Sequence, residues 1–218
     1  MLIGGGTGFI VFSKLIGLLL EIAPLFVCFF FVGAVLGGLP MVVKQANLKK
    51  FNFIDLLMTV VGIVIVCVIS AIPSGIFSID GLGGIGGVAV KILCGVILAF
   101  GFVLPGISFS QMLYVFGMYG EIVERVSNFD IFPLIPFGIG GIIGVFATSM
   151  LVEMLLKKYP SRVYMVICGF LIGSIPTLLK GQSLDGVPVW SYAVFAVLVV
   201  MGFAAVYAMT MIEDKKGK

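Results

Sequence analysis

The sequence predicts an all-α protein that crosses a membrane several times. Of its 218 residues, 61% are hydrophobic and only 11% are charged, whereas about a quarter of the residues in a soluble domain are charged. The mean hydropathy is +1.29. The apolar residues fall into runs of about 20, which is the length of a membrane-spanning helix. We therefore expect residues 1–218 to form a single membrane domain.

We expect about six transmembrane helices and one broken helical hairpin. The six runs of spanning length are 3–22, 24–43, 53–73, 132–156, 163–180 and 187–212. Two further apolar pieces, 87–104 and 105–121, lie between the third and fourth runs and meet at Pro105-Gly106. Lipid cannot satisfy the backbone groups that such a break frees. The break should therefore face protein or water.

The basic residues predict the orientation of the spans. They cluster after the second run, between the fourth and fifth runs, and at the C-terminus: Lys44, Lys49, Lys50, Lys157, Lys158, Arg162, Lys215, Lys216 and Lys218. Basic loops stay on the cytoplasmic side, so the C-terminus is predicted to be cytoplasmic. The segment 87–131 must then leave the outer side and return to it, either as a full pair of helices or as a re-entrant hairpin over 87–126.

An internal repeat links the two halves of the chain. Residues 3–40 align with residues 139–176 without a gap, at an offset of 136 residues. Most identities are Gly or Pro, among them Pro24 with Pro160, so they report helix breaks and close packing. Chance matching of two Gly-rich apolar hairpins is the alternative, and the unchanged spacing of the prolines argues against it.

The charge pattern predicts that the two repeats are inverted, because the turn at Pro24 faces outward and the turn at Pro160 faces inward. The first repeat covers 1–73 and the second covers 87–212. Inverted repeats with broken helices are typical of secondary transporters, in which the helix ends line the substrate site. The same offset places the first copy's broken segment before Met1, so we expect the first repeat to lack its re-entrant part.

The motif around the break reads PGISFS over 105–110, then GMY over 117–119, with the later GSIP at 173–176. It is similar to the hallmark of the bacterial polyprenyl-phosphate (undecaprenyl-phosphate) translocase family, which is Pro-Gly-(Ile/Val)-Ser-Gly-(Ser/Thr) followed by Gly-x-Tyr. Phe109 stands where many members have Gly, and the first copy of the motif is absent. The chain thus looks short at its N-terminus beside that family.

The resemblance implies a transporter that returns undecaprenyl phosphate from the outer to the cytoplasmic leaflet of the bacterial cell membrane during envelope synthesis. The implied partners are the polyprenyl-phosphate lipid and the bilayer, with no nucleic acid. No cofactor, metal or catalytic residue is expected, and the protein is not expected to be an enzyme. A homodimer is one way in which the missing copy of the motif would be supplied.

A phosphate head group needs hydrogen-bond donors and positive charge when it crosses hydrocarbon. If a helix begins near Ile107, its N–H groups favour an anion. The candidate residues at the break are Pro105, Gly106, Ser108, Ser110 and Gln111. The alternative is that Pro105-Gly106 is only a packing kink, with the serines bonded back to their own helix.

Charged residues inside apolar runs are costly and mark functional sites by default. Lys14 and Lys91 are the candidates to neutralise a phosphate, although Lys91 could instead extend its amine to the interface. Glu121 and Arg125 are four residues apart and can pair on one helix face, where the carboxylate would take up a proton or hold the arginine in place. A solvated surface cluster is the alternative. Tyr119 offers a hydroxyl to the head group. A similar pair, Glu153 with Lys157, is expected to be structural.

Other classes of function remain open on these residues. A small-solute or ion transporter on the same scaffold would differ in its cargo. A membrane enzyme such as a lipid phosphatase is disfavoured, because the sequence offers no evident general base. The chain has no histidine, and no base is apparent near the serines to activate them. A non-transporting assembly factor would leave the repeat without a purpose.

Overall fold

The structure is a computed structural model that describes residues 15–47, 52–73, 84–107, 109–180, 182 and 187–216. Most of these residues are helical, and they contain no strand. Six of the described helices are long and apolar enough to cross a membrane: Pro24–Gln45, Phe53–Ala71, Gly86–Val103, Phe132–Lys158, Pro160–Leu179 and Val189–Ile212. The predicted class, an all-α protein with several membrane spans, is confirmed. Most of the first predicted run, 3–22, lies outside the described residues.

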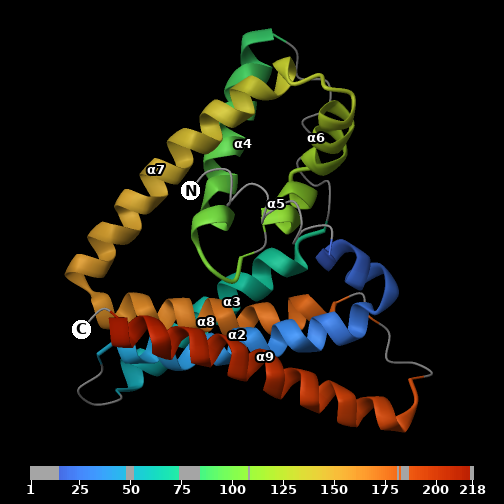
Figure 1. The fold of residues 1–218 in the computed structure, drawn as a ribbon. Coiled ribbons are helices and arrows are strands. Elements are labelled where there is room, and N and C mark those ends of the chain that lie inside the picture. Colours follow the sequence, from blue (N-terminus) through green and yellow to red (C-terminus); the bar gives the residue numbers. More distant parts are fainter. Residues whose placement is uncertain are drawn as a thin grey trace. The chain divides into compact units, whose positions relative to one another are not determined.

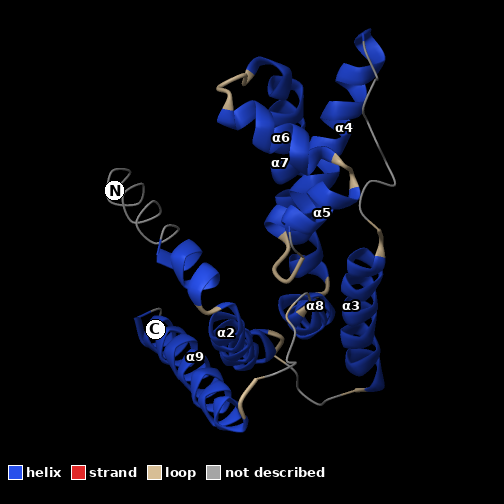
Figure 2. Ribbon diagram, turned by 90° about the vertical axis from the view of Figure 1, so that its right-hand side faces the viewer, coloured by secondary structure: helices blue, strands red, loops and turns tan. Residues whose placement is uncertain are grey.

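The chain forms two compact units. One comprises Met1–Met41 and Ile175–Lys218, and the other comprises Val42–Ser174. In the first unit, α2 (Pro24–Gln45) lies beside α9 (Val189–Lys216) (Figure 1 and Figure 2). Because proline at the first helical position loses no hydrogen bond, α2 can begin directly at its proline.

Close backbone contact holds α2 against α9. Gly33 lies so near the backbone of Val199 that a Cβ atom at this position would overlap the Val199 carbonyl oxygen. Phe195 fills the same interface, is 3% exposed and stacks on Phe29 with ring centroids 4.3 Å apart. Small residues that let backbones approach are the usual basis of helix association in membranes.

The second unit contains most of the remaining helices. They are α3 (Phe53–Ala71), α4 (Gly84–Val103), α5 (Phe109–Val115), α6 (Met118–Ser127), the 3-10 turn η1 (Phe132–Leu134), α7 (Ile135–Lys158) and the greater part of α8 (Pro160–Leu179). The α3 and α8 helices meet through facing glycines. A Cβ atom on Gly62 would overlap the backbone of Val166, and one on Gly169 would overlap that of Thr59.

The α4 and α7 helices make extensive contact in the second unit (Figure 1). Gly140 meets the backbone of Ile92, and Gly144 meets that of Val96. Residue numbers rise together along both helices, so α4 and α7 run in the same direction. The chain between them therefore returns to the end of the pair at which α4 began.

The returning arm is made of two short helices, α5 and α6. It turns at Gly117, whose φ of 67° is left-handed and suits glycine. A small apolar core fixes the arm to α4, and its buried members are Cys94, Leu98, Leu113 and Met118. The arm is thus held along one face of α4 rather than loosely tethered.

The first residues of two helices and one glycine contact recur at the offset seen in the sequence, although the ends of these helices do not. The α8 helix begins at Pro160, 136 residues after α2 begins at Pro24, and α9 begins 136 residues after α3. The contact of Gly33 with Val199 has a counterpart at the same offset in the contact of Gly169 with Ile63. The inversion of the repeats and the re-entrant character of the hairpin stay predictions.

Candidate functional site

Four charged side chains form a chain of ion pairs between α4 and the end of the returning arm. The Lys91 amine and the Arg125 Nε atom each donate to Glu121 Oε1 at 2.8 Å. Arg125 also donates through Nη1 to Asp130 Oδ2 at 2.8 Å. The predicted pair of Glu121 with Arg125 is therefore present. Lys91 joins the same carboxylate.

The position of the cluster makes it the strongest candidate site. Lys91 lies within the candidate span of α4, about 10 Å along the helix from its first residue. The side chains of Lys91 and Glu121 are only 18% and 21% exposed. A charge in such a place is expensive unless it is paired. Pairing with carboxylates therefore lowers the free-energy cost of placing Lys91 and Arg125 here.

The electrostatics of Glu121 follow from its partners. Partial burial raises the pKa of the Glu121 carboxyl, but the hydrogen bonds from Lys91 and Arg125 outweigh it and hold the pKa below its usual range. The hydrogen bond between Arg125 and Glu121 also raises the pKa of Arg125. Glu121 is therefore ionised at neutral pH.

The break at Pro105-Gly106 lies against a neighbouring helix. Gly106 has a φ of 89°, which favours glycine. A Cβ atom on Gly106 would lie 2.5 Å from the carbonyl oxygen of Phe170 on α8. The glycine is therefore required by helix packing on that side, where the sequence had suggested close approach of a phosphate. Pro105 is exposed.

The other predicted residues are placed as follows. The helix after the break begins at Phe109, so α5 has seven residues and carries exposed Ser110 in its first turn. Tyr119 is half-buried and stacks on Tyr114 with ring centroids 4.2 Å apart. Gln111 belongs to α5, and its side chain is not among those described. Lys14 and Ser108 lie outside the described residues.

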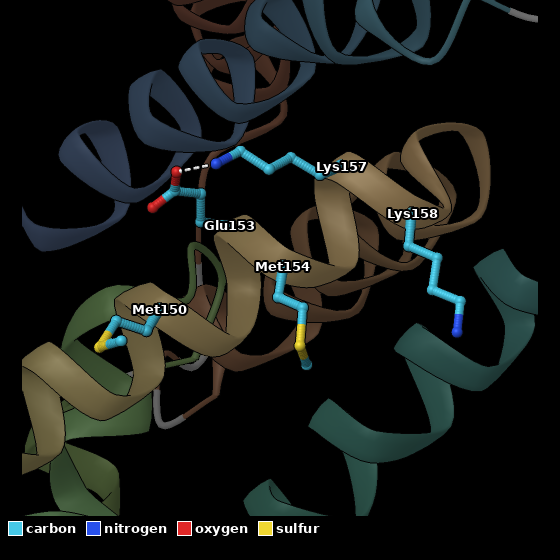
Figure 3. Close-up of a pocket in the computed structure, with 5 residues that line it drawn as sticks. All are labelled: Met150, Glu153, Met154, Lys157 and Lys158. Atoms are coloured by element: carbon cyan, nitrogen blue, oxygen red, sulfur yellow. Dashed lines mark hydrogen bonds and ion pairs between the residues drawn. The ribbon is translucent and has the colours of Figure 1, made fainter.

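A second polar feature lies at the end of α7, where a hollow of about 440 Å³ is lined by methionine and charged side chains. Figure 3 shows Glu153 joined to Lys157, while Met154 and Lys158 point to the other side of the helix. The Lys157 amine donates to Glu153 Oε1 at 2.6 Å, and both side chains are well exposed. The predicted structural pair is thus present.

Sequence reasoning missed two polar residues in this unit. Asp130 extends the ion cluster, and its signal was its spacing of five from Arg125. Thr148 is 1% exposed, and its hydroxyl has no hydrogen-bond partner in the part of the chain that the structure describes. Nothing in the sequence around Thr148 marks it as unpartnered, because a threonine in a helix can usually bond to the preceding turn.

The helices and the ion cluster define the chain as a multi-pass helical membrane protein with a charged site at one of its spans. A model of the undecaprenyl phosphate translocase-like family matches residues 1–194. The chain therefore belongs to that family.

Two curated relatives carry the same name, polyprenyl-phosphate transporter. The one from Vibrio cholerae is 28% identical over 172 residues, which is 79% of this chain and 53% of the relative. The one from Staphylococcus aureus is 28% identical over 192 residues, which is 84% of this chain and 66% of the relative. The chain thus spans between about half and two thirds of the length of these relatives. No solved structure matches it.

Proposed function

We propose that this chain moves polyprenyl phosphate between the leaflets of a bacterial cell membrane, from the outer to the cytoplasmic side. The observation that carries the proposal is the match of the translocase family model to residues 1–194. The names of the two relatives support the same cargo. Six apolar helices among the described residues supply the membrane setting that such a lipid requires.

In this proposal Lys91 and Arg125 bind the phosphate head group. Both cations converge on one oxygen of Glu121, so their donor atoms lie within reach of a single anionic oxygen. A phosphate that displaced this carboxylate would receive charge-assisted hydrogen bonds, and arginine can present two parallel donors to it. Glu121 then acts as the internal substitute that keeps the cations positioned while no lipid is bound.

Displacement of Glu121 would be easier if the carboxyl took up a proton as the phosphate entered. The other charged groups that face it are Lys91 on α4 and Arg125 on α6, with Asp130 beyond Arg125. Proton uptake at the outer face would supply a driving force for the cycle. Lys14, Ser108, Ser110, Gln111 and Tyr119 belong to the proposed path as further donors.

The proposed mechanism needs no covalent step, so we assign the chain as a transporter rather than an enzyme. The repeated helix starts support two copies of one structural unit, which we propose to be inverted, with the C-terminus cytoplasmic. Rocking of such copies would expose the ion cluster to either side in turn. A second copy of the chain, as a homodimer, would supply a second broken segment.

The test is lipid translocation in vesicles that contain the purified chain and a fluorescent polyprenyl phosphate. We expect Lys91→Gln to slow translocation about tenfold, because a charge-assisted hydrogen bond contributes about 1.5–3 kcal/mol. The matched control is Lys157→Gln, which removes an exposed paired lysine away from the cluster and should leave the rate unchanged. Equal rates for both variants would contradict the assigned site. Lys14→Ala and Ser108→Ala extend the test to the rest of the path.

A further inference from the structure

A second feature of the α4–α7 pair is an apolar groove of about 360 Å³. Its wall is formed by four phenylalanine rings and by glycines of α7: Phe102, Phe109, Phe137, Phe146, Gly138 and Gly141. The remaining lining residues are also apolar or glycine. Phe102 and Phe146 are 70% and 68% exposed, so the groove opens at the surface of the candidate spans.

The glycines of α7 fall into two kinds. Gly140 and Gly144 are required by packing, because a Cβ atom on either would overlap the backbone of α4. Gly138 and Gly141 have no such need, since a Cβ atom on either would meet no described residue within 4 Å. Glycine in a helix interior costs about 1 kcal/mol relative to alanine. Because these two residues have no side chain, the space beside them stays open and forms part of the groove.

The ion cluster and the groove share one face of α4. Lys91, Gly95, Ala99 and Phe102 follow one another at helical spacings of four, four and three residues, so they share that face. Lys91 bears the charge, whereas the other three residues line the groove. The face therefore carries a cation at one end and apolar groove residues beyond it, as far as Phe102, about 16 Å along the helix. An amphiphile with a small anionic head and a long apolar tail has this pattern.

The rings favour a branched, unsaturated tail within the groove. Phe102 on α4 and Phe109 on α5 lie edge to face, with ring centroids 6.4 Å apart, at the end of the groove beside the break. Flat aromatic rings suit the planar, methyl-bearing units of an isoprenoid. Phe109 also explains a departure from the family motif, because a phenylalanine here forms part of the groove wall.

We propose that this groove holds the first isoprene units of the polyprenyl phosphate while its phosphate is bound at Lys91. The proposal rests on the proposed function and adds to it the place where the tail lies. The groove orients the lipid and does not extract it, because lipid chains are as apolar as the groove and little hydrophobic energy is gained.

The experiment compares the binding of undecaprenyl phosphate and of geranyl phosphate, which has a short tail, to the purified chain in detergent. The test variants are Gly138→Leu and Gly141→Leu, which fill the groove. The control variant is Gly86→Leu on α4, where a Cβ atom also meets no described residue within 4 Å. Leucine is a better helix former than glycine, so all three variants should be at least as stable to heat as the unchanged chain.

We expect Gly141→Leu to weaken the binding of undecaprenyl phosphate about tenfold relative to Gly86→Leu. This is the low end of the effect that one extra or missing methylene has on binding in an apolar pocket. The binding of geranyl phosphate should be weakened similarly, because its two isoprene units are the first units that the groove is proposed to hold. Unchanged affinity for the long lipid in both groove variants would overturn the groove proposal and leave the proposed function standing. If the unchanged chain bound neither lipid, the proposed function itself would fail.

A second measurement does not depend on any variant. A polyprenyl phosphate with a photoreactive group near the head should cross-link to peptides covering 137–146 of α7 when it is irradiated with the unchanged chain. Cross-links confined to helices that do not line the groove would overturn the proposal.

Discussion

The ion cluster predicts a stability loss that can be measured without any lipid. Glu121→Gln removes the carboxylate that accepts from both Lys91 and Arg125 at 2.8 Å. An exposed ion pair contributes about 0.2–1 kcal/mol, and breaking a shielded pair costs more because a charge is left uncompensated. With two contacts to one carboxylate that is 21% exposed, we expect a loss of about 1–2 kcal/mol in the free energy of unfolding.

The assay is thermal unfolding in detergent, followed by circular dichroism at neutral pH. A loss of this size lowers the midpoint by about 4 °C in a chain of this length. The matched control is Glu153→Gln, which breaks a pair whose side chains are 64% and 76% exposed and should lower the midpoint much less, because water screens an exposed pair. Equal midpoints for the two variants would refute the claim that the cluster is shielded.

The pH dependence of this effect has a definite sign. The pKa of Glu121 is lower in the folded chain than its ordinary value of 4.5, so its contribution to stability is complete above about that pH and is lost as the pH falls through the folded pKa. The midpoint difference between the unchanged chain and Glu121→Gln should therefore shrink at acid pH. A difference that grew on acidification would contradict the assignment.

Two further predictions concern the packing of the helices. Gly33→Ala and Gly169→Ala should each destabilise the chain by about 2 kcal/mol in thermal unfolding, because both place a Cβ atom on a neighbouring backbone; a gain in stability at either would contradict the contacts. Thr148→Val should raise stability by about 1 kcal/mol, because it removes a buried hydroxyl that has no partner among the described residues. A clear loss on heating would show that the hydroxyl is satisfied.

Much of the fold could be predicted because apolar run length and charge act locally along the chain. The run ending near Lys44 and the pair of Glu153 with Lys157 depend on neighbours in sequence, and both are present. The ion pair of Lys91 with Glu121 joins residues that are 30 apart in the chain. The sequence could therefore identify both as candidates but could not predict that they form a pair.

The role of a glycine could not be predicted from its place in the chain. Gly106, Gly140 and Gly141 all lie in apolar segments. The first two are close to a neighbouring backbone, and the third faces open space. This difference depends on which helix lies alongside, which is a property of the packed unit. The groove therefore became visible only in three dimensions.

The most direct test of the central claim follows both lipid and small-anion movement in the same vesicles. Polyprenyl phosphate is added to the outer leaflet of vesicles that contain the unchanged chain, and its arrival in the inner leaflet is timed against protein-free vesicles, with phosphate flux measured in parallel. The account predicts that the lipid crosses faster with the chain present while free phosphate does not cross. Flux of free phosphate with no movement of the lipid would contradict it and would favour a small-solute transporter.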